Sequence, residues 1–161
     1  MSFRGKFTQF EPAVAFRFAI TSPNLGNGAP YLCKAAGTPK LDQGEIVIDY
    51  VNTDFKVKGK SRWQDITISM YDPIDNTEGS VAVHNWIKRH HDSESGVDGF
   101  AFSQYKEDMT LEVFGPDGFT YQTWKLYGAF ISAVDWGDMD WAGEDAKTIE
   151  LTIKYDYAVL S

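Results

Sequence analysis

The sequence is poor in cysteine and in basic residues. Cys33 is the only cysteine in 161 residues, so no disulfide can form within the chain and nothing points to an oxidising compartment. Lys and Arg number 15 against 23 Asp and Glu, which gives a formal net charge of −8. This excess of acid argues against a protein that binds nucleic-acid phosphates through clustered cations.

Long hydrophobic runs are also missing. No apolar run approaches the ~20 residues that a membrane-spanning helix needs. The first ten residues, MSFRGKFTQF, lack the apolar segment of a signal peptide. We therefore expect a protein that stays in the cytoplasm or leaves it by a route without an N-terminal signal.

The chain lacks the glycine-rich motifs GxxxxGK[ST] and GxGxxG, and its one approach to a calcium loop is incomplete. Asp138, Asp140 and Gly143 fit part of that pattern, but Ala142 stands at the fifth position and Ile149 at the twelfth, where a bidentate Glu belongs. We prefer to interpret this segment as a solvated acidic turn, formed by Asp135, Asp138 and Asp140 and anchored by Trp136 and Trp141.

The histidines and the cysteine give no better sign of catalysis or metal binding. His84, His90 and His91 share a helical segment but lack the i, i+4 spacing of helical zinc sites. No nucleophile signature surrounds Cys33, although a Cys–His pair stays open. With 23 acidic residues, chance carboxylate pairs are certain and carry no information. We expect no enzyme activity, no metal and no cofactor.

What the sequence does contain is alternating apolar and polar residues. In Lys147 to Tyr157, KTIELTIKYDY, apolar and aromatic residues occupy the odd positions. This period of two predicts one long β-strand with an apolar core face. Its polar face is formed by Thr148, Glu150, Thr152, Lys154 and Asp156, and we expect this face to line a lumen or to contact another subunit.

The same alternation predicts further strands at residues 13–20, 31–34 and 63–71, and a hairpin of residues 109–114 and 119–127 that continues through 129–134. Residues 76–91 are predicted to form the one helix, with Val83, Trp86 and Ile87 on its apolar face and Asn76 or Thr77 as its cap. Together these elements predict a single, mainly β domain spanning residues 1–161. Its fold would be a two-sheet sandwich or open β-barrel with one flanking α-helix.

Two segments are predicted to extend from this domain. Residues 41–60 form a projecting hairpin, because its return strand has little apolar mass to bury, and Lys56, Lys58, Lys60 and Arg62 make a solvated strand edge or a subunit contact. Residues 1–12 form an N-terminal arm with three aromatic residues that dock on the same or a neighbouring subunit, namely Phe3, Phe7 and Phe10.

Taken in order, several segments resemble the tail-tube proteins of contractile-tailed bacteriophages, a family shared with R-type pyocins, contractile injection systems and type VI secretion. The resemblance rests on the CKA segment at 33–35, the hairpin at 41–60, the W-x-D-I-T segment from Trp63, the MYD segment at 70–72, the helix with Trp86, and the acidic turn before TIELTIKYDY. Residues 21–30 and 92–106 depart from the family.

The resemblance implies hexameric rings that stack helically into a tube whose lumen conducts DNA or effectors. It implies contacts between rings through the projecting hairpin, with the contact residues Leu41, Asp42, Glu45, Asn52, Asp54, Lys56 and Lys58. It further implies a tail sheath, baseplate and tail terminator as partners. The lumen would hold a tape measure protein and would let DNA pass without specific binding. The location would be the virion tail, assembled in the host cytoplasm.

The residues themselves favour assembly as well. Long strands with unpaired edges invite association, and a closed ring removes those edges. An acidic lumen, built from six chains of net charge −8, would repel phosphates and let DNA pass. The alternative function is a small β-barrel that binds an apolar or carbohydrate ligand, with the aromatic residues, 15% of the chain, lining a pocket.

Overall fold

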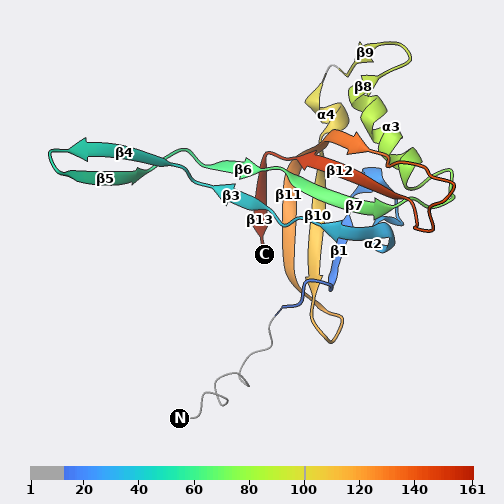
Figure 1. Ribbon diagram of the computed structural model, residues 1–161, viewed down its shortest axis with the longest axis horizontal. Coiled ribbons are helices and arrows are strands. Elements are labelled where there is room, and N and C mark those ends of the chain that lie inside the picture. The colour runs from blue at the N-terminus through green and yellow to red at the C-terminus, as the bar shows by residue number, and fades with distance from the viewer. Residues whose placement is uncertain (1–12, 100) are drawn as a thin grey trace, which may run out of the picture.

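The body of the protein consists of two antiparallel β-sheets that share one long strand. The computed structural model describes residues 13–99 and 101–161. One sheet has the order β1-β10-β11-β13, and the other has the order β11-β12-β7-β2. Figure 1 shows the strands of the two sheets running nearly at right angles, with the sheets not closed into a barrel. The predicted mainly β, two-sheet class is therefore confirmed.

The described residues contain thirteen strands, of which seven form the two sheets. The strands of the sheets are β1 (Phe18–Thr21), β2 (Cys33–Ala36), β7 (Ile66–Tyr71), β10 (Glu107–Phe114), β11 (Thr120–Asp135), β12 (Thr148–Lys154) and β13 (Tyr157–Leu160). The other strands form separate pairs, β3 (Lys40–Asp42) with β6 (Arg62–Gln64), β4 (Glu45–Tyr50) with β5 (Thr53–Lys58), and β8 (His91–Asp92) with β9 (Val97–Asp98). The helices are α2 (Ala29–Leu32), α3 (Ser80–His90), α4 (Phe102–Tyr105) and a 3₁₀ turn, η1 (Pro23–Leu25).

Strand β11 passes from one sheet to the other at a corner near Gly128. Its first half pairs with β10 and β13, and its second half pairs with β12, with a register shift between Ile131 and Ala133. Gly128 has φ +65, and a Cβ there would lie 2.2 Å from the Asp156 carboxylate. Only glycine fits this corner without strain, and such bends and bulges are how strands change sheets in orthogonal packing.

The core fills the space between the sheets and is capped by α3. The predicted apolar positions of the sheet strands point inward, because alternate residues of a strand face opposite sides. The most deeply buried side chains are Ile20, Leu25, Ile68, Met70, Val83, Met109, Leu126, Ile149, Leu151 and Ile153. These side chains form one contiguous apolar core in the interior of the sandwich.

Three strand predictions in the first half of the chain need correction. The strand predicted at 13–20 begins only at Phe18, because its partner β10 ends at Phe114, where the turn at Gly115 starts. Residues Ala29–Leu32 form a helical turn with Pro30 at its start, so the strand predicted at 31–34 begins at Cys33. The strand predicted at 63–71 is interrupted at Asp65, between β6 and β7.

The long C-terminal strand is also divided. It ends at Lys154, and Tyr157 begins β13 in the other sheet. The Asp156 amide donates to the Tyr127 carbonyl oxygen at 2.9 Å, which turns the chain from β12 toward the other half of β11. The alternation continues across this break, so the sequence pattern does not reveal it.

The helix predicted at 76–91 is confirmed from Ser80 onward, and α2 and α4 are short helices that were not predicted. Neither Asn76 nor Thr77 caps α3. The cap comes instead from Asp72, whose carboxylate accepts from the Ser80 amide at 3.0 Å and from the Ser80 hydroxyl at 2.7 Å. Lys147 completes this site with an ion pair of 2.9 Å to Asp72. None of the helices in the described part of the chain is long and apolar enough to span a membrane.

Replacing Asp72 with Asn should weaken the fold at neutral pH but not at low pH. Burial of Asp72 acts to raise its pKa, but the hydrogen bonds from Ser80 and the Lys147 ammonium outweigh it and lower the pKa. A lowered folded-state pKa contributes stability above the unfolded-state pKa, and this is lost as pH falls through the folded-state value. We expect Asp72→Asn to cost about 1–2 kcal/mol near pH 7, measured by urea unfolding, and progressively less below about pH 4.

The control is Asp138→Asn, which removes an exposed carboxylate that has no hydrogen bond or ion pair among the described residues and should change neither value. If Asp72→Asn cost the same at both pH values, the charge of Asp72 would have no part in stability.

Candidate functional site

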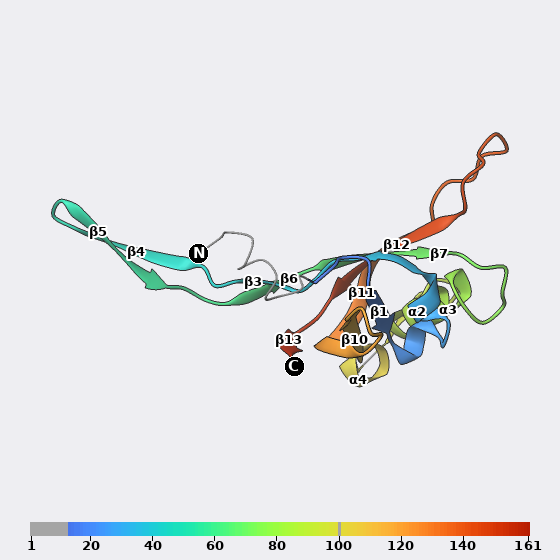
Figure 2. The ribbon, with the colours of Figure 1, turned by 90° about the horizontal axis from the view of Figure 1, so that it is seen from below.

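The largest exposed feature is the long hairpin, defined here as residues 40–64. Strands β3 and β6 form its base, and β4 and β5 form its outer part. Figures 1 and 2 show it reaching far from the sandwich. Every residue of β4 and β5 is exposed. The predicted projecting hairpin at 41–60 is thus confirmed in shape and is slightly longer than predicted.

The two faces of the outer hairpin differ in chemistry. Register places Ile46 opposite Val57, Ile48 opposite Phe55, and Tyr50 opposite Thr53. Because directly opposite residues share a face, five of these side chains form one apolar stripe, composed of Ile46, Ile48, Tyr50, Phe55 and Val57. The other face is mainly polar and carries Glu45, Val47, Asp49, Asp54, Lys56 and Lys58.

An apolar stripe on an isolated two-stranded hairpin needs a partner. Tyr50 is 73% exposed and Phe55 63% exposed, so the described residues leave both largely in water. A two-stranded hairpin alone is marginally stable in water. The stripe is therefore suited to contact another protein surface.

The tip of the hairpin is unusual in its backbone. Val51 and Asn52 form the two-residue loop between β4 and β5, and Val51 has φ +48 and is 90% exposed. Turns of this kind favour Asn or Gly, since a β-branched residue is strained at positive φ. An exposed, strained valine at the end of a projection is the kind of outlier that occurs at contact sites.

A second surface is the outer face of the sheet that contains β12. Thr148, Glu150, Thr152 and Lys154 lie on this face, and register places Ser69 and Thr67 of β7 opposite Glu150 and Thr152. Asp135 of β11 lies opposite Glu150 on the other side. Lys154 approaches Asp65 at 3.9 Å. The result is a face of mainly hydroxyl and acidic groups, with Lys154 at one end.

Asp156 does not share this face, in contrast to the sequence pattern. It follows β12 in the turn to β13, and its carboxylate accepts from Lys106 at 2.8 Å. The alternation grouped it with Glu150 because the chain changes sheets without a change in pattern.

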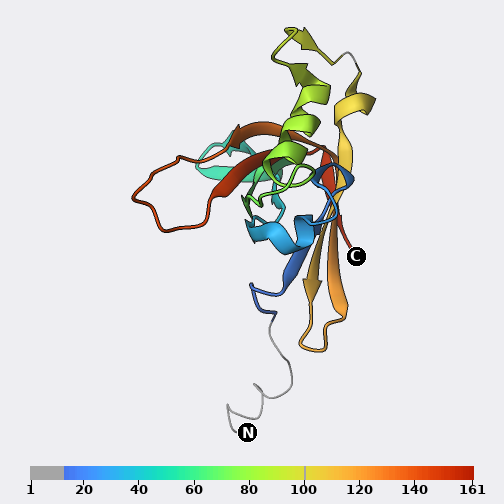
Figure 3. The same ribbon diagram turned by 90° about the vertical axis from the view of Figure 1, so that its right-hand side faces the viewer.

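The acidic loop after β11 projects from the opposite end of the body to the hairpin, as Figure 2 shows, and Figure 3 shows it extending away from the sheets. The Asp135 carboxylate accepts from the Gly137 amide at 2.8 Å, and that of Asp140 accepts from the Ala142 amide at 3.0 Å. Asp138 is exposed. The predicted anchoring by tryptophan is wrong, because Trp141 is fully exposed and Trp136 is also exposed.

The remaining candidates for chemistry are placed in structural roles. His90 stacks on Tyr105 with ring centroids 4.6 Å apart, and His91 bonds Asp98 between β8 and β9. Burial raises the pKa of Cys33 to about 11, so its thiol stays protonated and is a poor nucleophile at neutral pH. Within residues 13–99 and 101–161, no group of three or more His, Cys, Asp or Glu could hold a metal ion.

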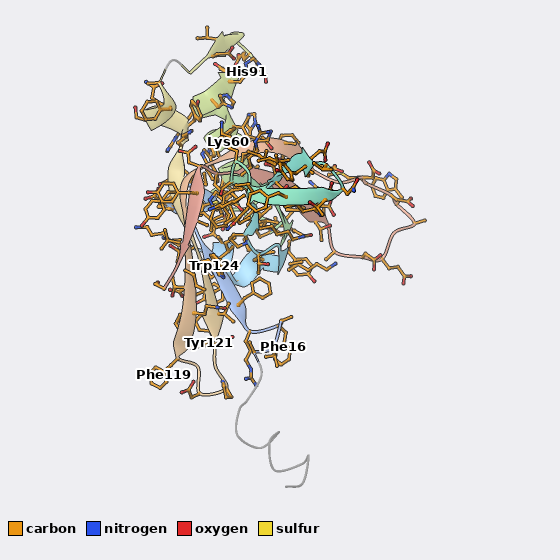
Figure 4. The ribbon with its side chains drawn as sticks, turned by 90° about the vertical axis from the view of Figure 1, so that its left-hand side faces the viewer. Phe16, Lys60, His91, Phe119, Tyr121 and Trp124 are labelled. Atoms are coloured by element: carbon orange, nitrogen blue, oxygen red, sulfur yellow. The ribbon has the colours of Figure 1, made fainter. Side chains whose placement is uncertain are left out.

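One surface was missed by sequence reasoning. Phe16, Phe119 and Tyr121 are exposed at one end of the molecule, as Figure 4 shows, beside a cleft of about 280 Å³ lined by Arg17, Phe114 and Tyr121 among others. Phe119 directly follows the turn at Gly118, where an aromatic side chain cannot reach a core. Its position in the sequence could therefore have indicated an exposed aromatic surface. The N-terminal arm of residues 1–12, with Phe3, Phe7 and Phe10, lies outside the described residues.

No protein-family model and no curated protein sequence matches the chain. Solved structures do match it. The PVC sheath/tube terminator of an extracellular contractile injection system aligns with TM-score 0.74 and 19% identity over 95% of this chain and 99% of that chain. The PVC sheath-tube complex aligns with TM-score 0.72 and 17% identity over 100% of this chain and 99% of that one.

A more distant match is Hcp1 from Flavobacterium johnsoniae, with TM-score 0.54 and 16% identity over 90% of this chain and 94% of that chain. The matches span nearly the whole length of both chains. The chain therefore has the fold of contractile tail-tube and tube-terminator proteins, as the sequence resemblance predicted.

Proposed function

We propose that this protein is a structural, non-enzymatic subunit of a contractile tail tube, assembling into hexameric rings that stack helically. The observation that carries the proposal is the long hairpin, whose outer twelve strand residues are all exposed and include the apolar stripe. Such a projection on this fold has a clear use as a link between copies. Head-to-tail contacts of this kind close into rings or extend as helical stacks.

The surfaces divide into distinct roles under this proposal. The hairpin residues Leu41, Asp42, Glu45, Asn52, Asp54, Lys56 and Lys58 contact the next ring, and the N-terminal arm docks on a neighbouring subunit. The polar face of β12 lines the lumen, since a surface of threonine, serine and glutamate offers little for anionic cargo to bind. The acidic loop, on the opposite side of the body, contacts an outer partner.

The partners follow from the same arrangement. The matched structures include a sheath-tube complex and a sheath/tube terminator, which supports a sheath and a terminator as partners of this chain. We further propose a baseplate at one end and a tape measure protein in the lumen during assembly. The cargo is DNA in a virion, or effectors in an injection system, passing without specific binding.

Negative-stain electron microscopy of the purified protein, concentrated to about millimolar subunit, tests the proposal. Rings or hollow fibres of uniform diameter are expected. A protein that stays monomeric in sedimentation at the same concentration, even with baseplate-like nuclei supplied, would exclude a tube subunit.

Replacing Glu150 with Lys should change assembly or passage without changing the fold. Glu150 is exposed and faces Ser69 and Asp135 across the sheet, so the new cation meets no buried group. We expect the free energy of unfolding to stay within about 0.5 kcal/mol of the wild-type value. Anionic cargo, probed by single-stranded DNA, should now bind assembled tubes in a salt-dependent manner.

The matched control is Glu94→Lys, which makes the same charge change at an exposed site near α3. Equal DNA retention by both variants would place Glu150 outside the lumen. Unfolding of the free Glu150→Lys subunit would show that the faces of β12 are assigned the wrong way round.

A further inference from the structure

The long hairpin is unevenly charged along its length. Its outer end, from Asp49 to Asp54, contains two carboxylates and no cation. The base, together with the adjoining ends of β4 and β5, contains twice as many cations as carboxylates, with Lys40, Lys58, Lys60 and Arg62 against Asp42 and Glu45. In a chain of net charge −8, this base is a basic island.

The two carboxylates at the outer end oppose each other. Asp49 and Asp54 are cross-strand partners, and both are exposed. Like charges directly opposite one another destabilise a strand pair. None of the ion pairs or side-chain hydrogen bonds recorded among the described residues includes either carboxylate, and the nearest cation on that face is Lys56, two residues farther along β5. This pair is therefore short of positive charge.

The base of the hairpin has the opposite imbalance. Register sets Glu45 opposite Lys58 and Asp42 opposite Arg62, so these charges are matched within one copy. Lys40 lies opposite Gln64, and Lys60 lies between β5 and β6, so neither has a carboxylate across from it. Figure 4, which views the hairpin from its tip, labels Lys60.

The two imbalances cannot cancel within one molecule. At about 3.3 Å per residue, Asp54 and Lys60 are roughly 20 Å apart along the strand. The screening length at physiological ionic strength is about 8 Å. The carboxylates of one copy must therefore meet the lysines of another copy for these charges to neutralise each other.

Apolar side chains are exposed at both the outer end and the base of the hairpin, so they could contact each other between two copies. The outer end presents Tyr50 and Val51 to water, and the base presents Leu41, which is 43% exposed and lies opposite the half-buried Trp63. An apolar contact beside a pair of complementary charges is the usual composition of a specific protein interface.

We propose that the outer end of the hairpin of one copy docks on the hairpin base of a second copy, with Asp49 and Asp54 facing Lys40 and Lys60. The inference rests on the proposed function and names the receiving surface for the hairpin. The contact joins two different patches, so it repeats head to tail from copy to copy.

A charge-swap experiment tests the contact. The tip variant, Asp49→Lys with Asp54→Lys, has a basic tip and a basic base. The base variant, Lys40→Glu with Lys60→Glu, has an acidic tip and an acidic base. Both keep the like-charge pair at the tip and the matched pairs at the base, so each subunit should fold as well as the wild type. Each alone should need at least about tenfold more protein to assemble, because like charges now meet at the contact.

Mixing the two variants at equal concentration should restore assembly to the wild-type threshold, since each tip then meets a base of opposite charge. The quadruple variant, which carries all four changes and the wild-type net charge, should assemble by itself. The control is Glu94→Lys with Glu144→Lys, which changes net charge as the tip variant does but at exposed sites outside the hairpin.

Normal assembly of both variants alone, or failure of both the mixture and the quadruple variant to assemble, would overturn the contact while leaving the tube function intact. If the tip variant assembled normally by itself but no longer bound another tail component, the acidic tip would serve that component instead of a second copy. Failure of the wild-type protein to assemble would instead exclude the proposed function.

Discussion

Replacing Ile48 and Phe55 with Ser will abolish assembly while leaving the free subunit as stable as the wild type. The two side chains face each other across β4 and β5 in the middle of the apolar stripe, and Phe55 is 63% exposed. In the free subunit they contact nothing in the sandwich, so their loss should change the free energy of unfolding by no more than about 0.5 kcal/mol. In the tube they would be buried against a second copy, where each large apolar side chain contributes about 1.5–3 kcal/mol. Because every subunit makes the contact, the loss is repeated along the whole assembly.

Thermal unfolding followed by circular dichroism measures the first effect, and electron microscopy with sedimentation measures the second. The control is Ile74→Ser, which removes a fully exposed apolar side chain outside the hairpin and should leave both measurements unchanged. Fibres formed by the double variant at the wild-type threshold would show that the stripe makes no contact between copies. A large fall in the melting temperature would show that the hairpin supports the sandwich instead.

Replacing Leu151 with Ala should have the largest effect on the free subunit. Leu151 is fully buried between its neighbours Ile68 on β7 and Val134 on β11, at the centre of the second sheet. Truncation of a buried leucine removes apolar contacts and leaves a cavity, at a cost of about 2–5 kcal/mol. For a domain of this size we expect the melting temperature to fall by roughly 5–15 °C.

The neighbouring residue provides the control. Glu150→Ala truncates an exposed side chain on the opposite face of the same strand and should change the free energy of unfolding by no more than about 0.5 kcal/mol. Equal losses for the two variants would contradict the assignment of one core face and one outer face to β12. Urea unfolding of both variants, in dilute protein so that assembly does not contribute, makes the comparison direct.

The faces of individual strands could be predicted from the sequence. The alternation identified three of the most buried side chains, those of Ile149, Leu151 and Ile153. A strand with one face on the core and one face in solvent requires a period of two. The projecting hairpin was predictable for a related reason, since its return strand held too few apolar residues to be part of a core. The apolar face of α3 was likewise visible in the spacing of Val83, Trp86 and Ile87, although its first turn was not.

The limits of strands were not predictable from their own residues. Residues 13–16 alternate as well as β1 does, but β10 ends at Phe114, whose amide donates to the Arg17 carbonyl oxygen, and has no backbone left for them to pair with. The cap of α3 comes from Asp72, eight residues before Ser80, and no local cap motif describes it. Tyr157 continues the alternation of β12 and yet belongs to another sheet, because the turn at Asp156 depends on Tyr127.

By itself, then, the sequence determined which residues are apolar and at what period, and from this the class of fold, the core face of each long strand and the existence of a free hairpin. Only the tertiary structure decided where Lys147 to Tyr157 divides between the sheets, which charges on the hairpin are matched across its strands, and which aromatic residues stay in water. The physical reason is that periodicity is a property of neighbours in the chain. Strand ends, caps and charge pairing depend instead on partners that the fold brings in from elsewhere.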